Sequence, residues 1–458
     1  MSAVEPGSER LDPLAAQTLA ETVLHLAEAA GATEAEVLVA VGDDALTRFA
    51  NSEIHQNVAE SDIRVSLRFV RGKRIGVASS GRTDPEALRR LAETAGRIAA
   101  IAEETRDWPG LPAAEPPAPV EGGFALATAD ASPEMRAAGV RAVIAAADAA
   151  GVGAFGSFST GVETVAVASS SGIRAAESRT AARLLTVSMG PDDGTGYAEA
   201  AAVDATAIDA AAVGREAAEK ARRSASPVNL PPGDYPVVLE EYAVADLLDN
   251  LGFIGFSGLS VEEERSFFEP GRRIGRELVT IVDVARDPAG MPAAFDYEGV
   301  PTRRVVMVEG GVCREIVHDA GTAARAGVPS TGHGLPAPNP WGPFPLHSAM
   351  AAGSTPREEL VGGMKRGLLV TRFHYTNVVH GKLAVITGMT RDGTFLVEGG
   401  EVVGSVRNLR FTQSYLDALV AVEAVASDRR LLRGELGAVL VPAVRIGSWR
   451  FTGATAAD

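Results

Sequence analysis

The sequence predicts an α+β protein: a duplicated N-terminal α+β unit, with helices over antiparallel strands, followed by a largely antiparallel β C-terminal domain. Three observations support this class. Residues 63–69 alternate between apolar and polar side chains, which is typical of a strand with one buried face. Helix, strands and helix occur twice in the same order before residue 226. Residues 365–411 contain several short β-rich runs separated by Asp-Gly and Gly-Gly turn signals.

The first unit is predicted at residues 1–107. Its first helix is indicated by apolar residues at helical spacing, with Gly31 as a C-terminal stop. A second helix begins at Thr83-Asp84-Pro85-Glu86, which combines capping-box spacing with an early proline. A proline-rich linker at residues 108–119 ends the unit. Strands are predicted between the helices, at residues 36–41, 45–50, 63–69 and 74–78.

The second unit, residues 120–226, repeats this order. A helix at residues 132–150 ends at Gly151, 120 positions after Gly31, and a helix at residues 206–223 closes the unit. We infer a duplicated unit. Few residues are identical between the copies, so two ordinary α+β units in succession are the alternative. Strands are predicted between the helices, at residues 154–159, 163–168, 173–178 and 182–189, with a further one from Tyr197.

The C-terminal domain, residues 233–458, follows a second proline-rich boundary. Its clearest signal is an antiparallel meander in which Asp392-Gly393 is predicted to form a tight hairpin turn, because both residues tolerate positive φ angles. Gly399-Gly400 is predicted to form the next turn. The meander strands are expected at residues 368–373, 383–388, 394–397 and 402–406. The other elements are expected at residues 235–239 (strand), 242–251 (helix), 279–284 and 303–308 (strands), 413–426 (helix) and 437–446 (strand).

Composition indicates a soluble cytoplasmic protein. The 458 residues are 46% hydrophobic, no apolar run approaches a membrane span, and the N-terminus lacks the basic and apolar regions of a signal peptide. The single cysteine, Cys313, excludes an intrachain disulfide and suggests a reducing compartment. The net charge of −16 argues against broad contact with nucleic acid. We therefore expect neither a membrane nor a nucleic acid as a partner.

Motifs that carry chemistry are scarce. The sequence has no Gly-rich phosphate loop after a strand, no CxxC pair and no HExxH zinc helix. His374 and His380 have the even spacing that would place them on one face of an unbroken strand. Asn377 is expected to break that strand, and no neighbouring cysteine or carboxylate completes a metal set, so a solvated strand end is the preferred interpretation.

Several stretches resemble the TldD/PmbA family, which has been described as modulators of DNA gyrase and is associated with metalloprotease activity. The run RFANSEIHQNVAESDIRVSLRFVRGKRIGVAS at residues 48–79 resembles its N-terminal signature. The runs that resemble its C-terminal domain are GDYPVVLEEYAVADLL, FDYEGVPTRR, HDAGTAARAG, STGHG, GLLVTRFHYTN and TGMTRDGTFLVEGGE. The resemblance covers nearly the whole chain in the right order.

The family has two branches, and the resemblance places this chain in the PmbA (TldE) branch. The TldD-like branch carries HExxxH after a strand, and its two histidines bind the metal together with a cysteine near the C-terminus. Aligning that motif with residues 233–248 puts Glu240 and Ala245 at the histidine positions and Glu241 at the glutamate position. Alanine cannot bind a metal, and Cys313 lies far from the C-terminus. The resemblance therefore implies no metal and no catalytic residue in this chain, and zinc in a TldD-like partner.

The resemblance also implies a heterodimer that encloses a cavity in which an extended peptide lies. Members of this type support maturation of ribosomally made antibiotic peptides and degradation of small or unfolded polypeptides. A homodimer is also possible. We expect polar residues next to glycine-rich loops to line such a cavity; the alternative is that they cap turns and strand ends. The candidates are His333, Arg372, His374, Tyr375 and Asn377.

Three functions are consistent with the sequence. The first is the metal-free subunit of a TldD/TldE-type metallopeptidase. The second is a self-sufficient hydrolase with an unrecognised site, which would require a metal without a partner. The third is a non-enzymatic protein that binds peptides or a protein partner.

Overall fold

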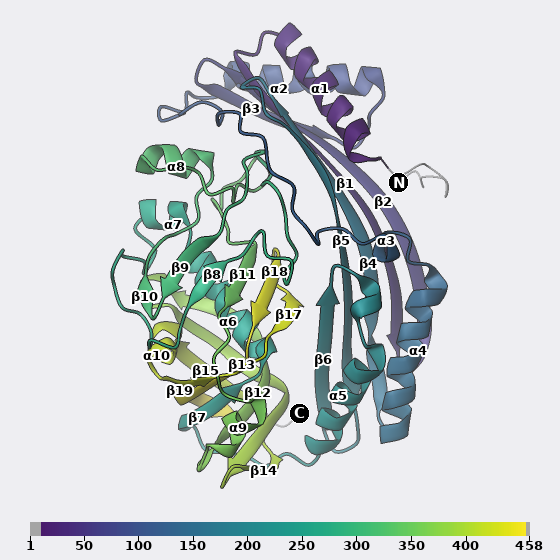
Figure 1. Ribbon diagram of the computed structural model, residues 1–458, viewed down its shortest axis with the longest axis vertical. Coiled ribbons are helices and arrows are strands. Elements are labelled where there is room, and N and C mark those ends of the chain that lie inside the picture. Colours follow the sequence, from purple (N-terminus) through teal and green to yellow (C-terminus); the bar gives the residue numbers. More distant parts are fainter. Residues whose placement is uncertain (1–10, 455–458) are drawn as a thin grey trace.

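The computed structural model describes residues 11–454 and confirms the α+β class. Figure 1 shows a long curved sheet with helices along its outer side, while the C-terminal domain faces the other side of the sheet. No helix within residues 11–454 is long and apolar enough to cross a membrane.

The curved sheet contains six antiparallel strands in the order β3-β2-β1-β4-β5-β6. Its two halves repeat one pattern of helix, three strands and helix, which confirms the predicted duplication. Strands β1 and β4 pair from Glu36 opposite Ser169 to Phe49 opposite Gly156, so the two units share one continuous sheet. The elements of the first unit are α1 (Pro13–Ala29), β1 (Glu34–Ala50), β2 (Glu53–Arg71), β3 (Arg74–Ser80) and α2 (Pro85–Ile101). Those of the second are α3 (Leu126–Ala129), α4 (Pro133–Ala150), β4 (Gly153–Ser169), β5 (Arg174–Met189), β6 (Thr195–Ala202), the 3-10 turn η1 (Ala205–Ala207) and α5 (Ala210–Arg223).

The long strands correct the prediction of shorter ones. Residues 36–41 and 45–50 belong to the single strand β1, and the predicted pairs in the second unit merge in the same way into β4 and β5. Asp43 and Asp44 suggest a turn, but Asp43 pairs with Ser61 on one side and with Val162 on the other. Pairing on both edges therefore overrides the local preference of these residues.

A proline and a capping side chain start α1, α2 and α4, and the sequence predicted this kind of start for α2. Asp84 precedes α2 and accepts a hydrogen bond from the Ala87 amide at 3.0 Å, while Ser132 accepts one from Met135 at 3.2 Å at the start of α4. Gly151 ends α4 in the left-handed conformation, with φ 71°, where a residue without a Cβ is favoured.

A closed sheet forms the centre of the C-terminal domain. Its strands run in the order β12-β7-β19-β15-β13, and β13 pairs back to β12. Trp449 is fully buried inside and stacks on Phe373 with ring centroids 5.0 Å apart. Its strands are β7 (Gly233–Leu239), β12 (Arg366–His380), β13 (Val385–Glu398), β15 (Leu409–Ser414) and β19 (Val444–Ala454), with β14 (Glu401–Ser405) and β16 (Val422–Val425) added outside.

A second sheet of the domain has the strand order β10-β9-β8-β11-β18-β17. Only β11 and β18 pair in parallel within it. Its strands are β8 (Ile281–Asp283), β9 (Val305–Glu309), β10 (Val312–Cys313), β11 (His347–Met350), β17 (Arg430–Arg433) and β18 (Ala438–Val441). The helices of the domain are α6 (Glu241–Ile254), α7 (Gly258–Glu262), α8 (Ala320–Ala326), α9 (Arg357–Gly362), α10 (Tyr415–Val420) and the 3-10 turn η2 (Gly381–Leu383).

The predicted hairpin turn at Asp392-Gly393 is wrong. These residues lie inside β13, where two residues face the single residue Thr371 of β12, between the pairs Val370–Thr394 and Arg372–Arg391. Their positive φ angles, 55° and 122°, form a β-bulge rather than a turn. The hairpin from β12 to β13 turns at η2 instead, whereas the turn at Gly399-Gly400 is confirmed.

The end of the chain also differs from the prediction. The helix expected at residues 413–426 is the short α10, followed by strand β16. The strand expected at residues 437–446 is divided into β18 and β19, which belong to different sheets. Pro442 lies at the division and has no amide hydrogen to continue a ladder.

Candidate functional site

Glu240 and Glu241 lie where β7 ends and α6 begins. Glu240 occupies the N-cap position of α6 and Glu241 its first turn, and Ala245 follows one turn later. All three are buried, and the Glu241 side chain has no exposed surface. Two adjacent buried carboxylates need cationic or hydrogen-bonding partners, because an isolated buried charge is very costly.

Arg357 and Lys220 supply these partners. Arg357, the first residue of α9, pairs with Glu241 and also lies 3.4 Å from Glu240 Oε1. Lys220 Nζ lies 2.6 Å from Glu240 Oε2. Burial raises the pKa of Glu241, and the Arg357 charge opposes that rise. The carboxylates of Glu240 and Glu241, at the positions aligned with HExxxH, are thus both paired with positive side chains.

Glu216 and Arg430 extend the ion pairs from α5 to β17. Lys220 Nζ donates to Glu216 Oε1 at 2.8 Å, and Arg430 donates to Glu216 Oε2 at 2.9 Å. Burial alone would raise the pKa of Glu216, but the two cations outweigh it and lower the pKa to about 2. We call the set of three acids and three bases the junction cluster: Glu216, Lys220, Glu240, Glu241, Arg357 and Arg430.

Tyr242 lies inside the junction cluster. Its hydroxyl accepts a hydrogen bond from the Glu199 amide at 3.1 Å and donates one to Glu216 at 3.0 Å. The Lys220 ammonium lies 5.0 Å from the centre of its ring. Burial and the Glu216 charge raise the pKa of Tyr242 well above its usual value, so this hydroxyl stays protonated.

Arg372, one of the predicted residues, lies beside this network. Its guanidinium donates to Asp392 at 2.7 Å and stacks 4.5 Å from the centre of the Tyr197 ring. The Tyr197 hydroxyl donates to Glu199, which also accepts two hydrogen bonds from Arg183 at 2.9 and 2.7 Å. The network therefore joins the second N-terminal unit to the C-terminal domain.

The junction cluster does not fit a zinc ion. Zinc is bound by free thiolate, imidazole or carboxylate groups in tetrahedral geometry. Here both carboxylates are paired with cations, and the third position carries the methyl group of Ala245. Within residues 11–454, no group of three or more His, Cys, Asp or Glu side chains is placed to hold a metal ion.

His374, Tyr375 and Asn377 follow Arg372 along β12. The strand continues to His380, so the prediction that Asn377 breaks it is wrong; an irregularity after His374 shifts the register instead. Tyr375 has a φ of 58° and is 75% exposed, and its carbonyl accepts a hydrogen bond from Asn377 at 2.9 Å. The rings of His374 and Tyr375 lie 5.8 Å apart; Tyr375 and Asn377 are exposed and His374 is half-buried.

His333 lies apart from the β12 residues. Its ring is buried, with Nε2 3.2 Å from Asp283 Oδ1 and Nδ1 2.8 Å from the Thr331 carbonyl. Burial opposes ionisation of Asp283, but the interactions with His333 and His347 together outweigh it and lower the pKa of this carboxyl. In this structure the His333 ring is enclosed by protein groups.

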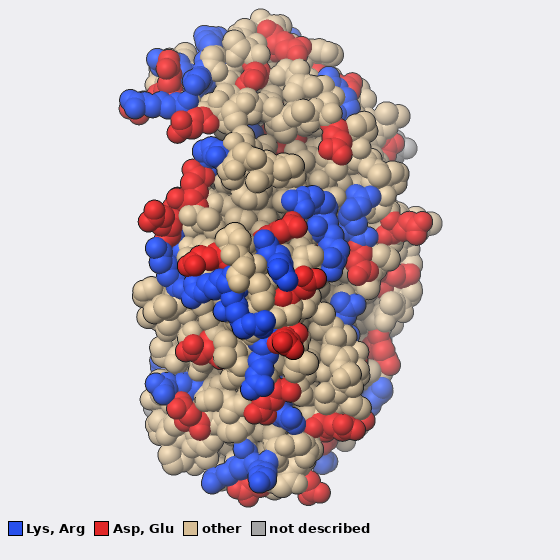
Figure 2. Space-filling model, turned by 60° about the vertical axis from the view of Figure 1, so that its left-hand side comes forward, with Lys and Arg blue, Asp and Glu red and all other residues tan. Residues whose placement is uncertain are grey.

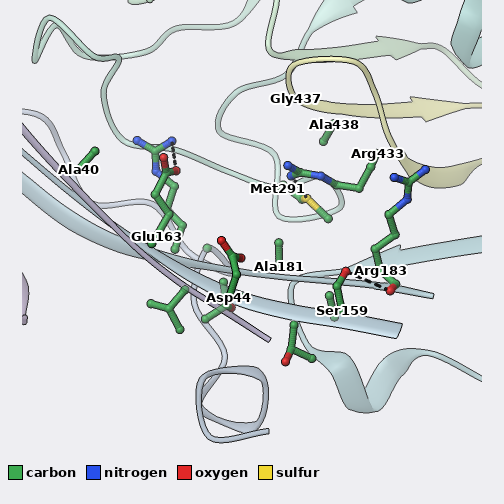
Figure 3. Close-up of a pocket in the computed structure, with 18 of the residues that line it drawn as sticks. Ala40, Asp44, Ser159, Glu163, Ala181, Arg183, Met291, Arg433, Gly437 and Ala438 are labelled. Carbon is green, nitrogen blue, oxygen red and sulfur yellow. Dashed lines mark hydrogen bonds and ion pairs between the residues drawn. The ribbon is translucent and has the colours of Figure 1, made fainter. Parts of the chain in front are cut away.

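A crevice of about 670 Å³ separates the curved sheet from the C-terminal domain. Figure 3 shows Asp44 and Glu163 rising from the strands, while Met291 and Arg433 approach from the opposite wall. Burial and neighbouring carboxylates raise the pKa of Asp44. Sequence patterns did not single out these residues, because the strands and loops that carry them are brought together only by the tertiary fold.

Charges of both signs are interspersed on the face shown in Figure 2. Beneath the surface, Arg68 lies between two buried acids at the boundary between the first unit and the C-terminal domain, 3.4 Å from both Glu36 and Glu298. Burial raises the pKa of Glu36 to about 7.

Three family models match the chain in succession. They describe PmbA/TldA metallopeptidase domain 1 at residues 35–99, the central domain at residues 126–225 and the C-terminal domain at residues 232–453. The match to the N-terminal models supports the division into two units, although the domain boundaries at residues 107, 120, 226 and 233 stay predictions.

Three curated relatives are 26–27% identical to this chain over slightly less than half of its length. A metalloprotease of Methanocaldococcus jannaschii is 27% identical over 48% of this chain and 50% of its own length. A metalloprotease TldD homolog of Haemophilus influenzae is 26% identical over 49% and 47%, and a zinc metalloprotease TldD homolog of Saccharolobus solfataricus is 26% identical over 43% and 44%. The matches span about half the length of these relatives.

Solved structures share the whole fold. TldE from Thermococcus kodakarensis superposes with a TM-score of 0.87 at 21% identity, covering 95% of this chain and 100% of that one. A protein of Thermotoga maritima described as a candidate modulator of DNA gyrase gives 0.83 at 19% identity, with the same coverage. At these identities the likeness concerns the fold.

Proposed function

The chain belongs to the PmbA/TldD metallopeptidase family, and on that premise we propose that it is the metal-free subunit of a heterodimeric metallopeptidase. The partner is a TldD-like subunit that carries zinc. The substrates are small or unfolded peptides in the cytoplasm, including leader peptides of ribosomally made antibiotic peptides.

The observation that carries this proposal is the position of Arg357. Its guanidinium faces both carboxylates at the places where HExxxH would supply a metal ligand and a general base. A base that activates water must be free to take its proton. Glu241 is instead buried and paired with Arg357, so its role is structural. The group that activates water is therefore proposed to lie in the partner.

This subunit shapes a cavity and holds an extended peptide. The side chains proposed to contact the peptide are the polar residues of β12, namely Arg372, His374, Tyr375 and Asn377. His333 is proposed as a further contact, which requires that the protein groups now enclosing its ring move away. Correct placement of reactants can supply roughly 7–11 kcal/mol of a reaction barrier at the extreme, so a subunit without a metal can still matter greatly for rate.

Reconstitution tests the proposal. Cleavage of an unfolded peptide is expected only when the chain is mixed with a TldD-like subunit. Glu241→Gln in this chain is expected to leave that activity largely intact, whereas the glutamate of HExxxH in the partner is essential. Loss of cleavage through Glu241→Gln, with folding and assembly unchanged, would make this chain catalytic and the proposal wrong.

A binding protein without enzymatic activity is the second candidate. The description of the Thermotoga maritima structure as a candidate gyrase modulator favours it. That reading predicts no cleavage with any TldD-like partner. A self-sufficient hydrolase, in contrast, would cleave alone and require added metal.

A further inference from the structure

More than half of strand β2 has an unpaired edge. Strand β1 accompanies β2 along its length, from Glu53 to Val70. Strand β3 covers the other edge only from Val65 to Arg71. From Glu53 to Arg64, no strand within residues 11–454 pairs with that edge. Twelve residues of strand extend about 40 Å at roughly 3.3 Å per residue.

This part of β2 is also exposed on both faces. Ten of the twelve residues are exposed, and Val58 and Ile63 are half-buried. Soluble proteins shorten, cover or distort their edge strands, because unpaired N–H and C=O groups attract another strand. A long uncovered edge therefore indicates a place where an extended chain can add to the sheet.

The charges beside the edge define what would fit. Glu60, Asp62 and Arg64 line the crevice and therefore face it from β2. Asp44 lies directly opposite Glu60 on β1, so acidic side chains continue across the sheet. Within residues 11–454, neither Glu60 nor Asp62 nor Asp44 has a salt-bridge partner within 4.0 Å. Directly opposite residues of opposite charge favour strand pairing by roughly 0.2–1 kcal/mol each.

A second copy of the chain satisfies at most one of the charges of Glu60 and Asp62: with Asp62 at a two-fold axis, Glu60 faces Arg64, but Asp62 faces its own copy. In an antiparallel pair related by a two-fold axis, one residue must lie opposite its own copy. With Val58 or Ala59 at the axis, Glu60 faces Gln56 or Val58, and with Glu60 at the axis it faces itself. No two-fold register that stays within the free edge puts a cation opposite both Glu60 and Asp62.

We propose that the free edge of β2, from Glu53 to Arg64, binds an extended peptide by strand addition and selects basic side chains at the positions opposite Glu60 and Asp62. The peptide's main chain pairs with β2, and alternate side chains point into the crevice. This inference rests on the proposed function, because it identifies the class of peptide that this subunit holds. It places the peptide beside the curved sheet and adds β2 to the β12 residues as a contact.

The test uses the full chain and fluorescein-labelled peptides of about eight residues with Lys or Glu at alternate positions and Thr between them. The Lys peptide is expected to bind at least about tenfold more tightly than the Glu peptide at low salt. The Glu60→Lys/Asp62→Lys variant is expected to reverse this preference. Glu86→Lys/Glu93→Lys, which makes the same charge change on α2, is the matched control and is expected to retain it.

Main-chain pairing is tested separately with two N-methylated forms of the Lys peptide. The methyl groups occupy alternate residues and differ between the forms by one position, so only one form blocks the amides that face β2. Loss of binding with one form and its retention with the other is expected. Equal binding of both forms, or an unchanged preference in Glu60→Lys/Asp62→Lys, would overturn the inference.

The failure of this inference is distinguishable from failure of the proposed function. If a reconstituted complex cleaves peptides while the β2 variants bind and process them normally, only the β2 site is wrong. If the Lys peptide binds β2 but no partner supports cleavage, the metallopeptidase role is wrong. If the β2 variants prevent assembly with the TldD-like subunit instead, the edge belongs to the subunit interface and the inference is overturned.

Discussion

Replacing Arg357 with Met should destabilise the protein through the buried carboxylates that it leaves behind. Glu241 has no exposed surface and pairs with Arg357, whereas Glu240 keeps Lys220 at 2.6 Å. Removing one partner of a buried ion pair typically costs about 3–5 kcal/mol. The Arg357 side chain is 33% exposed, so water can approach Glu241 in its absence. We therefore expect a loss of about 2–4 kcal/mol in the free energy of unfolding.

Urea unfolding of four proteins measures this effect: the wild type, Arg357→Met, Glu241→Gln and the double variant. The double variant is expected to recover most of the loss, because no uncompensated charge remains. Arg90→Met is the matched control. Its partner Glu86 lies 2.9 Å away on the surface of α2, where an exposed pair contributes about 0.3–0.5 kcal/mol.

The pH dependence of the loss gives an independent check. Burial already raises the pKa of Glu241, and removal of Arg357 takes away the charge that opposes this rise. A raised pKa in the folded state makes an acid stabilising at low pH and costly as pH rises. The deficit of Arg357→Met should therefore be larger at pH 8 than at pH 5. An unchanged free energy of unfolding in Arg357→Met, or an equal deficit at both pH values, would refute the ion-pair account of the motif positions.

Two further predictions concern the bulge and the boundary between domains. Gly393→Ala should lower the free energy of unfolding in urea by about 1–3 kcal/mol, because Gly393 has a φ of 122° and an added Cβ would meet Thr371 Oγ1 at 2.6 Å. Gly404→Ala is the control and should be nearly neutral, since no atom lies within 4 Å of its added Cβ. Equal effects of the two substitutions would contradict the bulge. Glu36→Gln should stabilise the protein relative to wild type by about 1–3 kcal/mol at pH 8 and hardly at pH 5. The reason is that burial raises the pKa of Glu36 to about 7, so the wild-type side chain is neutral in the folded protein at pH 5 and must carry a buried charge at pH 8. A stability difference that stays constant between these pH values would contradict the role of burial.

Local sequence patterns predicted the five long helices α1, α2, α4, α5 and α6, and the buried halves of the strands. Residues 63–69 alternate because one face of β2 packs into the core, where Val65, Leu67 and Phe69 have no exposed surface. The outer half of β2 has no buried face, so it has no alternation to detect. The Asp392-Gly393 pair correctly indicated positive φ angles, but the prediction of a hairpin turn there was wrong. Positive φ angles occur in a β-bulge as well as in a turn, and these two residues form a bulge.

The candidate site was only partly predictable. Resemblance to the motif located Glu240, Glu241 and Ala245, but not the residues that close the site. Arg357 lies 116 positions after Glu241 and comes from a separate helix. No periodicity or spacing connects such residues in a single sequence. The same holds for Arg372 and Tyr197, whose stacking depends on how the second unit docks onto the C-terminal domain.

Zinc analysis tests the central claim most directly. The chain, a TldD-like partner and their purified complex are each measured for bound zinc and for cleavage of an unfolded peptide. Because Arg357 and Lys220 pair with the carboxylates at the motif positions and Ala245 offers no ligand, the isolated chain is expected to bind no stoichiometric zinc. The complex is expected to contain about one zinc per heterodimer and to be the species that cleaves. About one tightly bound zinc in the isolated chain, together with cleavage in the absence of any partner, would contradict the account.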